Sequence, residues 1–308
     1  MSLERPEGVI AGHPLWRLTT VRTGGDADFF AKPETEDELI ALLAWARQEE
    51  LAIGMVGSGS NLLVSDHGFR GLAIKLAGDL TLIERDGVDL VCGGGARLPS
   101  AAAKTSGWGL TGLEFGVNIP GTAGGAVRMN ANAYGGRLAD IIDWVRICTA
   151  DGVERVTPDS LGFSYRESNL RNDQVVSRVA FRLTEDEPEK IKERLADMRS
   201  RRKEAQPSGI KTFGSTFKNP DDPRAEGRSS GQLLDAAGCR GLTVGGARLS
   251  EKHANFVENM GEASTADVIG VMAAAKRRIR EEFGIELEPE VQVLGDIEWP
   301  EDWDSSDG

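Results

Sequence analysis

Three polar residues lie on segments that no helix or strand pattern explains, and their side chains suit acid–base and anion chemistry. Arg166, in the sequence SYRES, is always cationic and suits a carboxylate partner. Ser215 carries a hydroxyl that can donate a proton, and Glu290 places a carboxylate at the head of an apolar run. The residue pattern leaves an alternative open for each residue. These are a surface ion pair of Arg166 with Glu167 or a strand neighbour, a turn hydroxyl for Ser215 and an ordinary surface carboxylate for Glu290.

The histidines and cysteines give weaker signals. For His253, a hydrogen-bonded structural role is favoured over that of a general base. Cys92, Cys148 and Cys239 lie in apolar runs or beside a glycine, which favours buried thiols over nucleophiles. No cluster of histidine, cysteine and carboxylate has the spacing of a metal site, so we expect no metal.

Two glycine-rich stretches can bring backbone N–H groups close to an anionic ligand. The first, Gly57-Ser58-Gly59-Ser60-Asn61-Leu62, follows a short apolar run, which is the context of a phosphate-binding turn. It lacks the third glycine of the dinucleotide pattern and the Lys-Ser/Thr of a Walker loop, so a plain turn is an equal alternative. The second stretch, residues 112–136, has too many glycines for a stable regular element, and we expect a long functional loop.

Composition narrows the class of protein. The 308 residues carry a formal net charge of -13, which argues against nucleic acid or an anionic membrane as partner. An odd number of widely spaced cysteines indicates a reducing compartment. Without an apolar run of bilayer length or a signal-peptide pattern, a cytoplasmic protein is expected.

Apolar periodicity predicts an α+β chain. Thr35 with Glu38 predicts the start of a helix, and strands are expected on both sides of a hairpin turn at Asp151-Gly152. A charged helix begins at Pro188, and a later helix is capped at Ser264 or Thr265. The acidic C-terminal residues read as a solvated appendage.

Six motifs, taken in order, resemble those of UDP-N-acetylenolpyruvoylglucosamine reductase, the flavoenzyme of bacterial peptidoglycan precursor synthesis. The resemblance runs from about Thr19 to Leu294. The motifs are GSGSNLLV from Gly57, IPGTAGGA from Ile119, Tyr165-Arg166, GSTFKNP from Gly214, SEKHANF from Ser250 and LEPEV from Leu287.

The resemblance implies a two-subdomain FAD-binding fold of the vanillyl-alcohol-oxidase type over residues 1–206, with subdomains of about 1–77 and 78–206. A small α+β substrate-binding domain over residues 207–296 and an acidic tail over residues 297–308 follow. The short segment between Arg166 and Ser215 resembles the subclass without an extra substrate-capping loop.

The implied reaction is the reduction of UDP-N-acetylglucosamine enolpyruvate to UDP-N-acetylmuramate. NADPH is the co-substrate that reduces non-covalently bound FAD, and flavin N5 delivers a hydride to C3 of the enolpyruvyl group. Ser215 gives a proton to C2, while Arg166 and Glu290 stabilise the enolate-like intermediate. The resemblance further implies a monomer that binds a UDP-sugar.

The motifs also imply binding residues. Cofactor contacts fall on Gly57, Ser58, Gly59, Ser60, Asn61, Leu62, Gly116, Ile119, Pro120, Gly121, Thr122, Gly124, Gly125 and Ala126. Substrate contacts fall on Tyr165, Lys218 and Asn219. The chain departs from the family pattern at Asn132 and Leu170. The alternative functions are another FAD-linked oxidoreductase acting on a small alcohol or lactone, and a non-catalytic nucleotide-binding protein.

Overall fold

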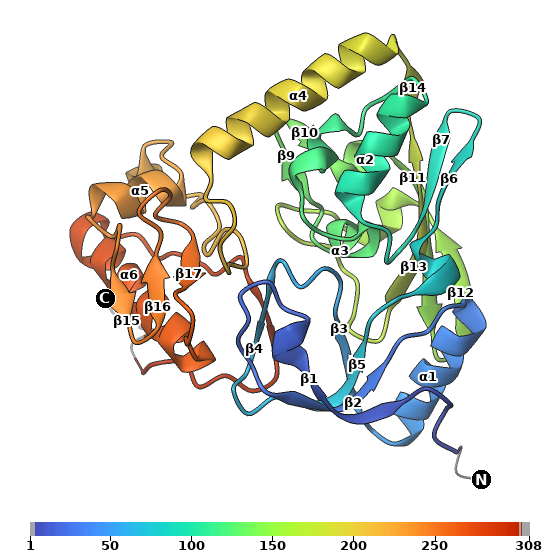
Figure 1. The fold of residues 1–308 in the computed structure, drawn as a ribbon, viewed down its shortest axis with the longest axis horizontal. Helices are drawn as coiled ribbons and strands as arrows, with labels where there is room; N and C mark the ends of the chain where they lie inside the picture. The colour runs from blue at the N-terminus through green and yellow to red at the C-terminus, as the bar shows by residue number, and fades with distance from the viewer. Residues whose placement is uncertain (1–3, 302, 304–308) are drawn as a thin grey trace. The chain divides into compact units, whose positions relative to one another are not determined.

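The computed structural model describes residues 4–301 and 303, and the α+β class expected from the sequence is confirmed (Figure 1). The residues cluster in two compact units. The first comprises the residues up to His13, Ala27–Ser58 and Arg70–Arg202; the second comprises Pro14–Asp26, Gly59–Phe69 and the residues from Lys203 onward. This division differs from the contiguous boundary expected at residue 206, because two N-terminal segments cluster with the C-terminal residues.

The N-terminal sheet has the strand order β1-β2-β5-β3, in which β3 and β5 are parallel. Its strands are β1 (Ile10–Pro14), β2 (Asp26–Ala31), β3 (Ala52–Met55) and β5 (Phe69–Ile74). Helix α1 (Glu36–Gln48) begins where predicted, because the Thr35 hydroxyl oxygen accepts a hydrogen bond from the Glu38 N–H at 3.2 Å.

A larger antiparallel sheet has the strand order β12-β11-β13-β7-β6. Its strands are β6 (Ile83–Asp86), β7 (Asp89–Gly93), β11 (Ile142–Thr149), β12 (Gly152–Val156) and β13 (Val175–Arg182). The predicted hairpin at Asp151-Gly152 joins β11 to β12, with Thr149 opposite Gly152. Helices α2 (Leu98–Gly107) and α3 (Ala123–Arg128) pack on this sheet (Figure 1).

The glycine-rich stretch 112–136 is not the irregular loop that we expected. It contains the 3₁₀ helix η3 (Glu114–Asn118), helix α3 and the paired strands β9 (Asn132–Ala133) and β10 (Gly136–Arg137). The N–H of Gly124 donates to the Gly94 carbonyl at 2.7 Å, and a Cβ on Gly124 would lie 3.0 Å from that oxygen. Close packing of α3 therefore outweighs the low helix propensity of glycine here.

The charged helix predicted to begin at Pro188 is α4 (Pro188–Ala205), whose buried residues are Ile191 and Leu195. Short elements connect the longer ones. They are η1 (Leu15–Arg17), η2 (Gly78–Thr81), β8 (Leu110–Thr111), η4 (Leu138–Asp140), η5 (Pro158–Leu161), β14 (Thr184–Glu185) and η6 (Pro223–Ala225).

The second unit contains the sheet β15-β16-β17 and helices α5 and α6, with α6 packed on that sheet (Figure 1). The bounds are β15 (Thr243–Val244), β16 (Ala247–Leu249), β17 (Val257–Asn259), α5 (Ser230–Ala236) and α6 (Thr265–Phe283). The predicted cap of α6 is a capping box between Ser264 and Asp267. Strand β4 (Leu62–Val64) pairs in parallel with β18 (Gln292–Leu294), which joins the segment 59–69 to this unit.

The expectation of a solvated tail over residues 297–308 is wrong for its described part. Trp303 is only 7% exposed, and Ile297 and Trp299 pack against the same apolar core of the second unit. Lys276 on α6 donates from Nζ to the Trp303 carbonyl at 2.5 Å. The apolar side chains among the acidic ones therefore anchor this segment. No helix within residues 4–301 and 303 is long and apolar enough to cross a membrane.

Candidate active site

Ser215 and Glu290, far apart in the sequence, lie on neighbouring segments of the second unit. Ser215 forms an isolated β-bridge with Phe256, and the N–H of Glu290 donates to the Thr216 carbonyl at 2.8 Å. Both Ser215 and Glu290 are half-buried. Backbone pairing thus brings the residues that carry the hydroxyl and the carboxylate, the two groups that the sequence proposed for proton and charge chemistry, onto neighbouring segments.

Asn61, the last polar residue of the first glycine motif, supports the Glu290 backbone. Its Nδ2 donates to the Glu290 carbonyl at 3.2 Å, and its own carbonyl accepts from the Gln292 N–H at 3.1 Å. The sequence predicted a cofactor contact for Asn61. The contact with Glu290 was not foreseen, because only the pairing of β4 with β18 brings these residues together.

Asn255 holds the segment that carries Ser215, and sequence reasoning assigned it no role. Its Oδ1 accepts from the Phe217 N–H at 2.9 Å, and its Nδ2 donates to the Phe217 carbonyl at 2.9 Å. His253 Nδ1 in turn accepts from the Asn255 N–H at 3.2 Å. Burial, followed by the charge of Arg240, lowers the pKa of His253, so a neutral acceptor imidazole is favoured. This agrees with the structural role predicted for His253.

The two predicted substrate residues of this unit already have protein partners. Lys218 Nζ lies 3.2 Å from a Glu288 carboxylate oxygen, and its side chain is 21% exposed. Asn219 is exposed, and its Oδ1 accepts from the Ser230 N–H at 3.1 Å, at the start of α5. The Lys218 N–H also donates to the Glu288 carbonyl at 2.9 Å, which holds the backbone next to the Ser215 segment.

Arg166 lies in the first unit, in a tight turn with a positive φ of 62°. Its Nη1 donates to the Asn132 carbonyl at 3.3 Å, and its guanidinium lies 5.3 Å from the centre of the exposed Tyr165 ring. Asn130 Nδ2 donates to the Ser164 carbonyl at 2.9 Å. These contacts hold the Arg166 turn against the segment that follows α3. Arg166 uses the backbone of Asn132, so the departure from glycine at residue 132 does not create this contact.

The first glycine motif crosses the division between the units at Ser58 and Gly59. In the first unit, a Cβ on Gly57 would lie 2.9 Å from Thr122 Oγ1, so the two predicted cofactor motifs adjoin there. In the second unit, Gly59 has a φ of 67°, and a Cβ would lie 1.9 Å from the Leu18 carbonyl. Close backbone packing therefore explains the glycine at residue 59 without a ligand.

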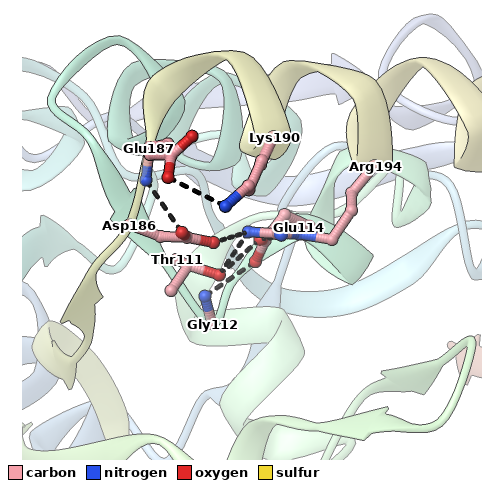
Figure 2. A network of polar contacts seen from close by, with 7 residues as sticks. All are labelled: Thr111, Gly112, Glu114, Asp186, Glu187, Lys190 and Arg194. Atoms are coloured by element: carbon pink, nitrogen blue, oxygen red, sulfur yellow. Dashed lines mark hydrogen bonds and ion pairs between the residues drawn. The ribbon is translucent and has the colours of Figure 1, made fainter.

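An ion-pair network centred on the buried Glu114 anchors the start of η3 (Figure 2). Glu114 is 7% exposed and accepts hydrogen bonds from the Thr111 hydroxyl at 2.6 Å, the Gly112 N–H at 2.7 Å and Arg194 Nε at 2.9 Å. Arg194, on α4, also donates to Asp186 at 2.7 Å. Burial alone raises the pKa of Glu114, but these hydrogen bonds outweigh burial, and the pKa lies below its ordinary value. The network ties α4 to the segment that leads into the Ile119 motif, a role that the sequence did not reveal.

The cysteines are buried, as predicted. Burial raises the pKa of Cys92 to about 12 and that of Cys148 to about 11. Neither thiol forms the thiolate that nucleophilic chemistry needs near neutral pH.

The chain's donor set fits an anionic dinucleotide. Lys75 donates from Nζ to the Gly57 carbonyl at 2.5 Å, so a cation lies directly beside the glycine turn. A cation beside backbone N–H groups can bind phosphate oxygens.

Comparison with known proteins gives concordant matches. A family model described as FAD binding domain matches residues 27–157, and one described as UDP-N-acetylenolpyruvoylglucosamine reductase, C-terminal domain, matches residues 206–294. The chain is 40% identical over 304 residues to the UDP-N-acetylenolpyruvoylglucosamine reductase of Agathobacter rectalis, covering 94% of this chain and 95% of the relative. It is 40% identical over 285 residues to that of Rubrobacter xylanophilus, covering 92% and 94%. The crystal structure of the reductase from Thermus caldophilus matches with a TM-score of 0.79 and 36% identity, covering 95% of this chain and 98% of that one.

An FAD binding domain followed by a reductase C-terminal domain defines a flavin-dependent oxidoreductase. The chain belongs to the UDP-N-acetylenolpyruvoylglucosamine reductase family. The family inferred from the six motifs is thus confirmed, and the alternative of a different FAD-linked oxidoreductase is not favoured.

Proposed function

We propose that this enzyme reduces the enolpyruvyl ether of UDP-N-acetylglucosamine to the lactyl ether of UDP-N-acetylmuramate, with NADPH as the reductant. FAD, when bound, supplies the hydride chemistry, accepting a hydride from NADPH and giving it to C3 of the substrate. The observation that carries the proposal is the placement of Ser215 and Glu290 on hydrogen-bonded neighbouring segments.

The side chains have distinct roles in the proposed reaction. Ser215 donates a proton to C2, because a hydroxyl keeps its proton at neutral pH, where an ordinary carboxyl group has lost its own. Arg166 binds the substrate carboxylate, whose negative charge grows as the enolate-like intermediate forms. Glu290 completes the polar surroundings of that intermediate. Tyr165, Lys218 and Asn219 contact the UDP-sugar.

The remaining assignments follow the same family motifs. The cofactor contacts are the Gly57–Leu62 turn, Gly116, Ile119–Thr122 and Gly124–Ala126. Residues 1–206 mainly hold the flavin, and residues 207–296 mainly hold the substrate, with the segments 14–26 and 59–69 contributing to the C-terminal unit. The protein acts as a cytoplasmic monomer of the subclass without the extra substrate-capping loop.

The test uses the flavin as its own reporter. Purified protein should show the flavin absorption bands, NADPH should bleach them, and UDP-N-acetylglucosamine enolpyruvate should restore them under anaerobic conditions. Acid precipitation should release the flavin, since the proposed binding is non-covalent. Bleached flavin that the enolpyruvyl substrate fails to reoxidise would refute the proposed reaction. Small alcohols and lactones serve as control substrates and should leave oxidised flavin unchanged.

A further inference from the structure

Lys75 and the glycine turn at Gly57 lie at the same end of the N-terminal sheet. Strands β3 and β5 lie side by side (Figure 1) and are parallel, with Met55 opposite Ile74. Gly57 and Lys75 therefore both lie just beyond the carboxyl ends of these strands. The 2.5 Å hydrogen bond from Lys75 Nζ to the Gly57 carbonyl joins the two segments.

Two more cations belong to this region. The N–H of Lys75 donates to the Ala31 carbonyl at 3.0 Å, which brings the end of β2, and with it Lys32, beside Lys75. Arg97 forms an isolated β-bridge with Thr122, whose side chain adjoins Gly57. Burial lowers the pKa of Lys75, and the positive charges of Lys32 and Arg97 lower it further.

Within residues 4–301 and 303, the three cations have no carboxylate partner. In the part of the chain that the structure describes, none of Lys32, Lys75 and Arg97 forms an ion pair with a carboxylate, although the chain carries a formal net charge of -13. Lys32 and Arg97 are exposed, but Lys75 is half-buried and fixed on the turn. Bringing like charges together costs free energy, and an anionic ligand offsets that cost.

We propose that Lys75, with Lys32 and Arg97, forms the cationic half of a diphosphate site that holds FAD. The turn at Gly57 has no basic side chain of its own, so the cluster supplies the positive charge and the turn supplies backbone donors. NADPH and the UDP-sugar carry the same diphosphate chemistry. FAD is favoured because all four residues lie within residues 27–157, the part of the chain that matches the FAD binding domain.

The test measures the dissociation constant of FAD with flavin-free protein. Lys75→Met should raise the FAD dissociation constant about 10- to 100-fold, the equivalent of one charged hydrogen bond, whereas Lys75→Arg should preserve most of the affinity. The matched control is Lys104→Met on α2, whose Nζ donates to the Ile83 carbonyl at 3.3 Å. It should change the constant by less than about twofold. Lys75→Met should also weaken the dependence of FAD binding on salt concentration, which a purely structural role would not do.

Three further ligands separate the possible readings. Riboflavin has no phosphate, so its affinity should be equal in the wild type and Lys75→Met. An equal loss for riboflavin and FAD, or an unchanged FAD constant, would overturn the proposal. A loss for UDP or NADP⁺ without a loss for FAD would overturn the assignment to FAD.

A second variant covers the case in which Lys75→Met does not fold. Lys32→Gln combined with Arg97→Gln alters only exposed side chains, and it should raise the FAD dissociation constant at least about fivefold at low salt. An unchanged constant would overturn the role of the cluster. None of these measurements uses NADPH turnover or the enolpyruvyl substrate, so their outcome is independent of the proposed reaction.

Discussion

The side chain of Asn255 hydrogen-bonds both backbone polar groups of Phe217, with Oδ1 to N–H and Nδ2 to carbonyl distances of 2.9 Å each. The Asn255 amide thereby makes the two hydrogen bonds that a neighbouring strand would make with Phe217, on the segment that carries Ser215. Both residues are buried, so water does not replace these bonds. A proton donor on a segment held in this way keeps the fixed geometry that proton transfer requires.

Asn255→Ala should therefore lower the free energy of unfolding and the rate of one half-reaction, the reoxidation of the flavin by the substrate. Each buried backbone group of Phe217 left without a partner costs about 1–3 kcal/mol of unfolding free energy. Denaturation in urea should show this loss. Reoxidation of the reduced flavin by the enolpyruvyl substrate should slow, while reduction by NADPH is retained. Folded Asn255→Ala with wild-type reoxidation would show that the clamp does not position Ser215.

Ser215→Ala separates the two half-reactions more sharply. The change removes one hydroxyl and little volume, so folding, FAD binding and flavin reduction by NADPH should survive. Reoxidation by the enolpyruvyl substrate should fall at least about 10²-fold, the lower end of what a positioned general acid contributes. Stopped-flow absorbance resolves the two steps, and Ser208→Ala, at an exposed position before the Ser215 segment, is the control. Equal slowing of both steps would indicate a structural role for Ser215.

Glu114→Gln tests the network that anchors η3 (Figure 2). The amide cannot accept from Thr111, Gly112 and Arg194 as the carboxylate does, so a loss of about 1–3 kcal/mol of unfolding free energy is expected. Arg194 keeps Asp186 as a partner, which limits the loss. Glu189→Gln, at the exposed start of α4, is the control and should change the stability by less than about 0.5 kcal/mol.

The contribution of Glu114 should also depend on pH. Its pKa in the folded protein is lowered, so its stabilising effect is fully present above the unfolded-state pKa of about 4.3 and is lost as the pH falls through the folded-state pKa. The difference in melting temperature between the wild type and Glu114→Gln should therefore shrink below about pH 4. A difference that stays constant from pH 7 to pH 3 would contradict this assignment.

Trp303→Ala tests whether the C-terminal segment is part of the folded core. Removing a buried tryptophan should cost about 3–5 kcal/mol of unfolding free energy, and Lys276 would lose the ring that lies 4.8 Å from its ammonium group. Chemical denaturation measures the loss. Trp16→Ala, at a position 42% exposed, should have a much smaller effect. Equal stability of wild type and Trp303→Ala would show that the packing of this segment contributes nothing.

Local signals in the sequence predicted much of the fold. Thr35 and Ser264 cap helices because their hydroxyl oxygens accept hydrogen bonds from nearby backbone N–H groups, and such contacts span only three residues. The hairpin at Asp151-Gly152 is local for the same reason. Ser215, Glu290 and Arg166 were identified as candidates from their residue types and their places in the six motifs. The sequence did not reveal what each of these side chains contacts.

The sequence by itself therefore determined the family, the α+β class and the identity of the candidate chemical groups. Only the tertiary structure decided that Asn61 supports Glu290, that Asn255 clamps Phe217 and that Lys75 lies on the Gly57 turn. It also placed Gly124 in a helix and Trp303 in the core, against expectation. Each of these contacts joins segments that are distant in sequence, and strand pairing and burial, which act through space, determine which of them meet.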